Sequence, residues 1–445
     1  MTRVWCSRAV LDSQVREDVE VVVASGRIAA LGPDLPQARG DADVVLDGVV
    51  APAFANTHSH LFHRGLRGAG GGEDFWSWRE RMYALAARLD PDSYHRLARA
   101  AMGEMLDAGY TRLGEFHYVH HDVERRWGRH EMELALAHAA CEAGMRLTLL
   151  DTCYLHAGLG PDGSGLPLAR EQAGFGDGSV HGWLERWHEL REVLPEGVEL
   201  GAAVHSVRTL TPREIAEAVA GLPGDVPLHV HLSEQPRENA ECLAATGLTP
   251  TGVLREAGAL SPRTTAVHAT HLSDDDVAAL AGAGTSVSLC PSTEADLGDG
   301  IARVDDLLGA GVRMGIGSDE NVVTDPFLEL RMLEAGARLS LGRRGVVASE
   351  ELWRIGTTHG RAMLTARAEH PARDGAGLAV GQDADLVCID PSSARLAGVD
   401  PLRYPVVATG DDVTATVVAG RVVPHSDPAT LREALAGLGV SDGSR

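Results

Sequence analysis

Short apolar runs alternate with amphipathic segments through the middle of the chain. The runs are nearly continuous in apolar residues, which is typical of parallel strands buried on both faces. Amphipathic stretches such as "TPREIAEAVAGL" and "DDDVAALAGAG" lie between them and predict helices. Eight strand–helix units predict an α/β fold, the (β/α)8 TIM barrel. The eight runs are "VVAPAFA", "YTRLGEFHY", "MRLTLLDTCY", "VELGAAVHSV", "VPLHVHLSE", "TTAVHATHL", "TSVSLCPST" and "VRMGIGSDE".

Local signals mark one helix and one long loop. In "DPDSYHRLARAAMGEMLDAG", Asp90 and Pro91 match a helix N-cap and the first helical position. Gly109 matches the glycine that follows a helix end. The longest irregular stretch, about Gly158 to Ser179, is rich in glycine, and we expect it to form a loop over the functional site.

Both ends of the chain differ from its middle. "VEVVVASGRIAALGP" near the start and "VTATVVAGRVV" near the end contain β-branched runs interrupted by turn residues, which predict small antiparallel strands. We therefore predict a small β-sandwich domain built from both termini, residues 1–51 and 370–445. Residues 52–369 are predicted to form the catalytic barrel.

Charge narrows the choice of partners. The chain has 445 residues and a formal net charge of -23 at pH 7, so phosphate backbones and anionic membranes would repel it. We predict no nucleic-acid or membrane partner, and an anionic substrate would need a local cluster of arginines. The N-terminus "MTRVWCSRAVLDSQ" has no long apolar core of a signal peptide, and no apolar run approaches the length of a membrane span.

The cysteines point to a reducing compartment. Six cysteines are present, none forms a C-x-x-C pair, and several lie in apolar runs. We interpret them as buried free thiols, so the cytoplasm is the predicted location.

Histidines concentrate where the predicted strands end. In "FANTHSHLFHRG", His58 and His60 are two residues apart, so on a strand both rings leave from the same face. The plain alternative is two polar residues bonded to backbone at a strand end. Catalytic residues of a TIM barrel lie at the carboxyl ends of its strands, and reading only those ends favours a metal site. The other strand-end residues are Glu115, His117, His205, Arg208, His229, His231, Glu234, His268, His271, Ser318 and Asp319.

Four of these residues form a plausible ligand set with three nitrogens and one oxygen. They are His58, His60, His231 and Asp319, and they suit one Zn2+ per chain, with Fe2+ as a second choice. His229 shares the face of His231 and is an alternative ligand or a packed neighbour. A structural role is favoured for His271.

Three residues are candidates for acid–base catalysis. Glu234 lies three residues after His231 and can reach a metal-bound water without ligating the ion, although it can also be read as a solvated loop carboxylate. His268 can hydrogen-bond that water and polarise the electrophile. Asp319 can take the water's proton while ligating the metal.

The order of these residues resembles the amidohydrolase superfamily, with H-x-H on strand one, histidines on strands five and six, and aspartate on strand eight. "HLSE" is similar to the aminohydrolase branch, which splits C–N bonds and releases ammonia. "DFWSWRERMYALAARLDP", "EFHYVHHD", "VHATH" and "STEADLGDGI" resemble the formimidoylglutamate deiminases more closely. The resemblance implies zinc-dependent hydrolysis of N-formimidoyl-L-glutamate to N-formyl-L-glutamate and ammonia, a step of bacterial histidine degradation. It places acid–base roles at Glu234, His268 and Asp319.

The same resemblance implies substrate contacts at Arg79, Tyr118, His205 and Arg208, and at His63, where that family has glutamine. A second departure is Glu320-Asn321, where that family has Ser-His after the aspartate. Arginines suit this substrate because their planar forks match its two carboxylates. Surface salt bridges are the alternative for both arginines.

Two rival functions stay open. One is a related aminohydrolase acting on another formimidoyl or guanidino acid, or on a heterocycle such as guanine. The other is a non-enzymatic binding protein on a degenerate barrel, against which the complete ligand set argues. We predict a homodimer.

Overall fold

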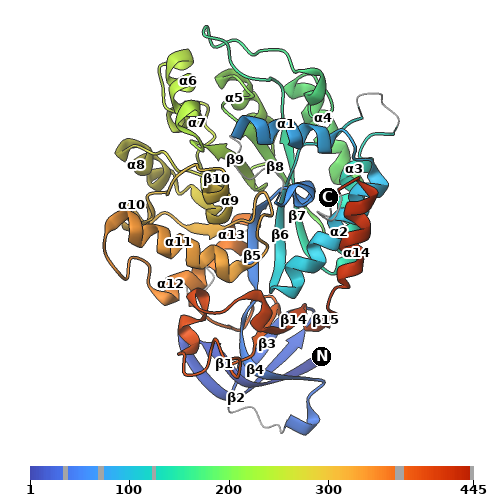
Figure 1. The fold of residues 1–445 in the computed structure, drawn as a ribbon, viewed down its shortest axis with the longest axis vertical. Coiled ribbons are helices and arrows are strands. Elements are labelled where there is room, and N and C mark those ends of the chain that lie inside the picture. The colour runs from blue at the N-terminus through green and yellow to red at the C-terminus, as the bar shows by residue number, and fades with distance from the viewer. Residues whose placement is uncertain (34–38, 69–74, 123–126, 366–374, 441–445) are drawn as a thin grey trace.

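Eight parallel strands close into a barrel, which confirms the predicted fold class. A computed structural model describes residues 1–33, 39–68, 75–122, 127–365 and 375–440 (Figure 1). The strand order around the barrel is β10-β11-β12-β5-β6-β7-β8-β9. The strands are β5 (Phe54–Ser59), β6 (Tyr110–His117), β7 (Arg146–Cys153), β8 (Glu199–Ser206), β9 (Leu228–Leu232), β10 (Thr264–His268), β11 (Ser286–Leu289) and β12 (Met314–Ile316).

Helices follow the barrel strands and surround them (Figure 1). The first long one begins as predicted: Asp90 accepts a hydrogen bond from the backbone N–H of Ser93 at 2.7 Å, Pro91 is the first helical residue, and Gly109 follows with φ of 99°. The helices are α1 (Phe75–Ala86), α2 (Pro91–Asp107), α3 (Glu131–Ala143), α4 (Val180–Val193), α5 (Pro212–Gly221), α6 (Pro236–Thr246), α7 (Pro250–Glu256), α8 (Asp274–Ala283), α9 (Pro291–Asp296), α10 (Val304–Gly309), α11 (Pro326–Leu341), α12 (Ser349–Arg354), α13 (Gly360–Leu364) and α14 (Pro428–Gly437).

Both termini contribute to a separate seven-stranded sheet of order β15-β14-β13-β4-β1-β2-β3. Neighbouring strands pair antiparallel, as predicted, except that β1 and β4 are parallel. The parallel pair arises because the β2–β3 hairpin covers one edge of β1, and β4 returns to its other edge in the same direction. The strands are β1 (Thr2–Leu11), β2 (Gln14–Ala24), β3 (Arg27–Gly32), β4 (Val44–Pro52), β13 (Leu386–Ile389), β14 (Val413–Val418) and β15 (Arg421–Val423).

The sheet encloses an apolar core of its own, as the sandwich prediction requires. Val4, Val19, Leu46, Leu386 and Val417 are among the buried side chains of that core, and they come from strands at both ends of the chain. The sheet lies at the amino ends of the barrel strands (Figure 1). It therefore leaves the carboxyl ends of those strands open for a site.

The predicted domain boundaries remain predictions. The boundary between residues 51 and 52 falls within β4, and that between 369 and 370 lies outside the described residues. Helix α14 follows the last sheet strand but packs on α2 of the barrel, where the hydroxyl of Ser426 donates to Asp107 (Figure 1).

All six cysteines are free, as predicted. Five are buried, but Cys141 on α3 is exposed, so the expectation of burial is wrong for this residue. It lies on the outward side of an alanine-rich helix whose other faces carry the packing. In the described parts of the chain, no helix has both the length and the apolar character that crossing a membrane requires.

Candidate active site

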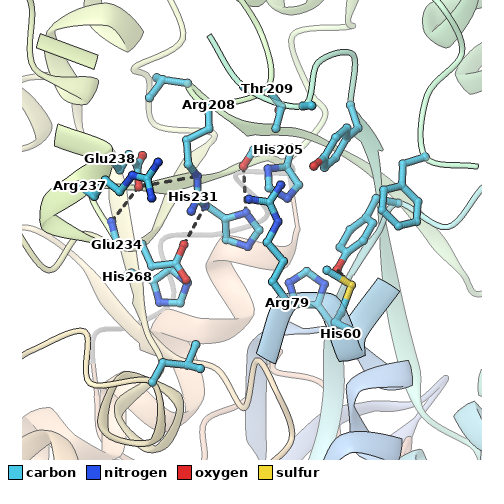
Figure 2. Close-up of a pocket in the computed structure, with 18 of the residues that line it drawn as sticks. His60, Arg79, His205, Arg208, Thr209, His231, Glu234, Arg237, Glu238 and His268 are labelled. Atoms are coloured by element: carbon cyan, nitrogen blue, oxygen red, sulfur yellow. Dashed lines mark hydrogen bonds and ion pairs between the residues drawn. The ribbon is translucent and has the colours of Figure 1, made fainter. Parts of the chain in front are cut away.

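A cavity of about 370 Å3 opens at the carboxyl ends of the barrel strands (Figure 2). Its wall includes residues from the ends of β5, β8, β9, β10 and β12, and from helix α1. Gly158, Leu159, Leu166 and Phe175 belong to it too, so the stretch predicted as a loop over the site does line this cavity.

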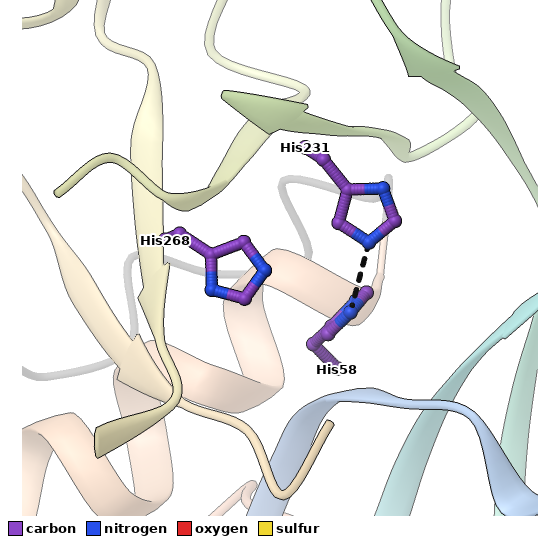
Figure 3. A group of neighbouring side chains, drawn as sticks. All are labelled: His58, His231 and His268. Carbon is purple, nitrogen blue, oxygen red and sulfur yellow. Dashed lines mark hydrogen bonds between the residues drawn. The ribbon is translucent and has the colours of Figure 1, made fainter. Parts of the chain in front are cut away.

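Four ligand atoms converge at the floor of the cavity. Asp319 Oδ1 lies 3.2 Å from His58 Nε2 and 3.4 Å from His60 Nε2, and His231 Nε2 lies 3.2 Å from His58 Nε2. Zn–N bonds of about 2.0–2.1 Å place the ligand atoms of a tetrahedral site about 3.3–3.4 Å apart. His58, His60 and Asp319 therefore fit a single divalent ion, and His58 also groups with His231 and His268. Figure 3 shows His58 and His231 beside a third ring, His268.

The ligand rings are oriented from behind. His60 donates from Nδ1 to the carbonyl of Phe116 at 2.8 Å, and His231 donates from Nδ1 to the carbonyl of His205 at 2.9 Å. Each bond leaves Nε2 without a proton and turned to the shared centre. Burial lowers the pKa of His60 to about 3 and holds the pKa of His58 and His231 well below the ordinary value. The rings are thus neutral, as metal ligands must be.

Two other histidines lie apart from this centre. His229 Nε2 lies 3.3 Å from the carbonyl of Met363, on the side of α13, and burial lowers its pKa to about 4. It therefore packs one layer deeper in the barrel. His271 Nε2 lies 2.8 Å from the carbonyl of Asp299, which agrees with the structural role predicted for it.

Glu234 and His268 stand beside the ligand cluster (Figure 2). Glu234 Oε2 accepts a hydrogen bond from Arg208 Nη2 at 2.7 Å, and its Oε1 lies 3.9 Å from His268 Nε2. His268 Nε2 is also 3.8 Å from Asp319 Oδ2, and its Nδ1 is 3.5 Å from Glu294 Oε1. Burial alone would lower the pKa of His268, but Glu234, Glu294 and Asp319 outweigh it and raise this pKa to about 10.

The backbone around these side chains is strained. Ser233, His268 and Asp319 have φ of 49°, 68° and 41°, in the left-handed region that non-glycine residues rarely adopt. The Glu238 carboxylate supports one of these turns by accepting the N–H groups of Ser233 at 3.2 Å and Glu234 at 3.1 Å. Glu238 therefore fixes the segment that carries Glu234.

Asn321, the second half of the Glu320-Asn321 departure, joins strand eight to strand one. Its Nδ2 donates to the carbonyl of His60 at 2.9 Å, and its Oδ1 accepts from Ser318 Oγ at 2.7 Å. Asn56 completes the chain by donating to Ser318 Oγ at 2.6 Å. The network holds the main chain of two ligand-bearing turns together.

The predicted substrate residues all line the same cavity. His63 Nε2 lies 3.2 Å from the hydroxyl of Tyr118, and burial holds the pKa of His63 well below its ordinary value. Arg79 donates to the hydroxyl of Tyr83. His205 has its pKa lowered by burial and by the charges of Arg208 and Arg79, so both guanidiniums lie near it (Figure 2).

Three acidic residues of the site carried no assignment from the sequence: Glu238, Glu294 and Glu320. Glu294 lies in "STEADLGDG", part of a string that resembles the formimidoylglutamate deiminases, so this resemblance could have identified it as a site residue. Glu238 acts on backbone N–H groups, which side-chain patterns do not reveal. Glu320 is only 3% exposed, and its burial beside Asp319 raises the pKa of its carboxyl group, so the group needs a nearby positive charge to be ionised.

Two strand-end residues have structural surroundings instead. Glu115 accepts the N–H of Leu61 at 2.8 and 3.0 Å and the hydroxyl of Tyr94 at 3.1 Å, so it holds the turn after His60. His117 lies outside the cavity, 3.4 Å from Glu133.

The sequence and the fold agree with known proteins. The amidohydrolase family model matches residues 49–423. The chain belongs to the amidohydrolase family. This amidohydrolase is 40% identical, over 95% of its length and 94% of the relative's, to formimidoylglutamate deiminase from Pseudomonas aeruginosa. It is 29% identical to 8-oxoguanine deaminase from the same organism, over 84% of its length and 81% of the relative's.

Among solved structures, an amidohydrolase from Brucella melitensis is 32% identical and superposes with a TM-score of 0.88, covering 98% of this chain and all (100%) of that one. Family membership makes the chain a metal-dependent hydrolase that acts on C–N bonds, and the ligand cluster described above fits that requirement.

Proposed function

We propose that this amidohydrolase hydrolyses N-formimidoyl-L-glutamate to N-formyl-L-glutamate and ammonia. One observation supports the proposal: candidate metal ligands, the proposed acid–base pair and two guanidiniums, Arg79 and Arg208, line the same cavity. A formimidoyl dicarboxylate needs each of these parts. The formimidoylglutamate deiminase from Pseudomonas aeruginosa, similar over nearly the whole length, supports the same substrate.

The ligands in this proposal are His58, His60, His231 and Asp319, and the metal is zinc. When bound there, zinc would lower the pKa of a water molecule, so that hydroxide becomes available to attack the formimidoyl carbon. Asp319 accepts the proton of the attacking water, since its Oδ2 faces His268 and is not the oxygen nearest to His58 and His60.

Glu234 and His268 complete the acid–base chemistry. Glu234 Oε2 is occupied by Arg208, which leaves Oε1 on the side of His268 to carry a proton to the imino nitrogen. Ammonia then leaves. His268 donates from Nε2 to the oxygen that adds to the formimidoyl carbon, and Glu294 at its Nδ1 keeps the ring in that orientation.

Other residues of the cavity wall orient the substrate, among them Arg208 beside Glu234. Arg79 and Arg208 bind the two carboxylates, and His63, Tyr118 and His205 shape the space between those groups and the metal centre. His63 and Tyr118 contact each other, so the histidine takes a defined position where the related family has glutamine.

The proposal extends to the biological setting. The enzyme would act in bacterial histidine degradation, in the cytoplasm and as a homodimer. Light scattering of the purified protein tests the last of these, and a monomer would contradict it.

Ammonia release by zinc-loaded protein tests the function. We expect turnover of formimidoyl-L-glutamate, weaker turnover of formimidoyl-L-aspartate, and none of guanine. Arg208→Met should lower kcat/KM for the dicarboxylates, because a buried substrate carboxylate loses its partner. The loss corresponds to about 2–5 kcal/mol of transition-state stabilisation. Arg237→Met is the matched control, since this arginine lines the same cavity but bonds Glu241. A kcat/KM for the dicarboxylates in Arg208→Met that equals the native value would contradict the assignment.

Deamination of a heterocycle is the second candidate. The cavity also presents aromatic rings that a planar base can stack on, namely Trp78, Tyr83, Tyr118, Tyr154 and Phe175. The similarity to 8-oxoguanine deaminase favours this alternative too. A preference for guanine or 8-oxoguanine over formimidoyl-L-glutamate would establish it.

A further inference from the structure

Glu320 places a buried carboxylate in the wall of the active-site cavity. It directly follows the ligand Asp319, lines the cavity and is only 3% exposed. Its backbone N–H is bonded to Thr293 Oγ1 at 3.2 Å. Neither carboxylate oxygen has a hydrogen-bond partner in the described parts of the chain. Buried polar atoms are rarely left in this state, because their desolvation is then uncompensated.

Charge around Glu320 makes its position more costly. The charged groups that act on it most are all acidic: Asp319, Asp296, Asp299 and Glu234. Arg208, which also lines the cavity, is bonded to Glu234 instead. Within the described residues no side-chain cation pairs with Glu320. The positive charges available to compensate its burial are therefore the metal ion held by Asp319 and a cationic group of the ligand, and only the ligand can donate hydrogen bonds to the carboxylate.

We propose that Glu320 binds the cationic amidinium end of the substrate. The proposal rests on the function proposed above and defines its specificity. A formimidoyl group is a planar cation whose N–H donors match a carboxylate, as a guanidinium does. The cavity would then be bipolar, with Arg79 and Arg208 for the carboxylates and Glu320 for the amidinium. Neutral amides and ureas of the same shape would bind less well.

The same contact would help the product to leave. Hydrolysis replaces the cationic imino nitrogen of the substrate by a neutral carbonyl oxygen. The oxygen cannot donate to Glu320, so the product loses this interaction once ammonia has formed. Glu320 would thereby favour substrate over product without taking part in the chemical step.

A matched pair of substrate analogues tests the proposal, with ammonia release from each ligand measured in parallel. N-amidino-L-glutamate and N-carbamoyl-L-glutamate differ only in a cationic nitrogen group against a neutral oxygen. Calorimetry on zinc-loaded native protein should show tighter binding of the amidino ligand. Glu320→Gln should weaken the binding of the amidino ligand by about 10- to 100-fold, the range for a hydrogen bond to a charged group. The affinity for the carbamoyl ligand should stay unchanged.

Asp296→Asn is the control, because Asp296 acts on Glu320 electrostatically but is exposed. Asp296→Asn should change the affinity for each ligand by no more than about twofold, since exposed charges are screened. If Glu320→Gln does not fold, Glu320→Ser takes its place. Equal loss for both ligands, unchanged binding of the amidino ligand, or no preference in the native protein would overturn the proposal. Absence of ammonia release from formimidoyl-L-glutamate, with the ligand preference intact, would instead count against the proposed reaction alone.

Discussion

Individual nitrogen atoms decide which histidines can bind a metal. His231 and His229 are two residues apart on β9, and both are fully inside the barrel. Only His231 has its Nδ1 bonded to a carbonyl and its Nε2 turned to His58. The side-chain period of a strand cannot distinguish the two, because it places both on one face.

We therefore expect about one zinc ion per chain in purified protein, and its removal by a chelator should abolish activity that Zn2+ restores. His231→Ala should lose the ion, whereas His229→Gln should retain it. Elemental analysis of the folded proteins measures this. Full activity in rigorously metal-free protein, or loss of metal in both variants, would contradict the ligand set.

Proton transfer by Glu234 is tested by a substitution at this residue. Glu234→Gln keeps the shape of the side chain but cannot carry a proton, so kcat should fall by about 100-fold or more at unchanged metal content. Glu241→Gln, a change in the same cavity wall, is the control and should keep kcat near native. Steady-state kinetics and metal analysis decide, and a near-normal kcat for Glu234→Gln would move the proton transfer to another residue.

At the scale of elements, helices α3 and α4 are joined to the barrel by a buried ionic network. Arg186 on α4 is fully buried and bonds Glu133 at 3.0 Å, Asp151 at 2.7 Å and Asp177 at 2.9 Å. Trp183 donates to Asp151 at 2.8 Å. One guanidinium thus bonds carboxylates from α3, β7 and the loop before α4.

Arg186→Met should destabilise the fold by about 3–5 kcal/mol, because it leaves buried carboxylates without their cation. Arg191→Met, an exposed change on the same helix, should cost no more than about 0.5 kcal/mol. Denaturant unfolding gives both values. Equal stability of the two variants would show that the network adds nothing.

The same network predicts sensitivity to acid. Burial alone would raise the pKa of Glu133, but hydrogen bonds from His117 and His120 and the charge of Arg186 hold it well below its ordinary value. The pKa of Asp177 is lowered in the same way by His121 and Arg186. A lowered pKa contributes stability above the unfolded value, about 4, and that stability is lost as the pH falls further. Unfolding free energy measured from pH 6 to pH 3 should therefore fall less steeply in Arg186→Met.

At the scale of the whole molecule, the sheet and the barrel are tied together far from the active site. Asp385, at the start of the sheet segment after the barrel, accepts two hydrogen bonds from Arg146 of β7 at 2.7 and 3.1 Å. It also accepts the N–H of Ala419 at 2.9 Å. These contacts lie at the amino ends of the barrel strands, opposite the metal centre.

Asp385→Asn should lower stability by about 1.5–3 kcal/mol, the range for hydrogen bonds to a charged group. It should leave kcat/KM within about twofold of native, because distant sites act independently. Asp383→Asn is a companion variant, since Asp383 bonds Arg112 at 3.2 Å in the same layer. A large loss of kcat/KM at full stability would show that the sheet does influence the site.

The sequence by itself determined the architecture and which side chains lie at the strand ends. Repeated apolar runs predicted eight parallel strands, and strand-end positions brought His58, His60, His231, His268 and Asp319 into one set. Both inferences depend only on periodicity and on where a barrel places its strand ends.

Only the tertiary structure decided what holds and surrounds those side chains. The contacts of Glu238 with backbone N–H groups, of Glu294 with His268 and of Asn321 with His60 join segments that are distant in sequence or leave no side-chain pattern. The parallel pairing of β1 with β4 depends on which sheet edge was still open. The state of Glu320, buried and without a hydrogen-bond donor among the described residues, exists only once the chain has folded and formed the cavity.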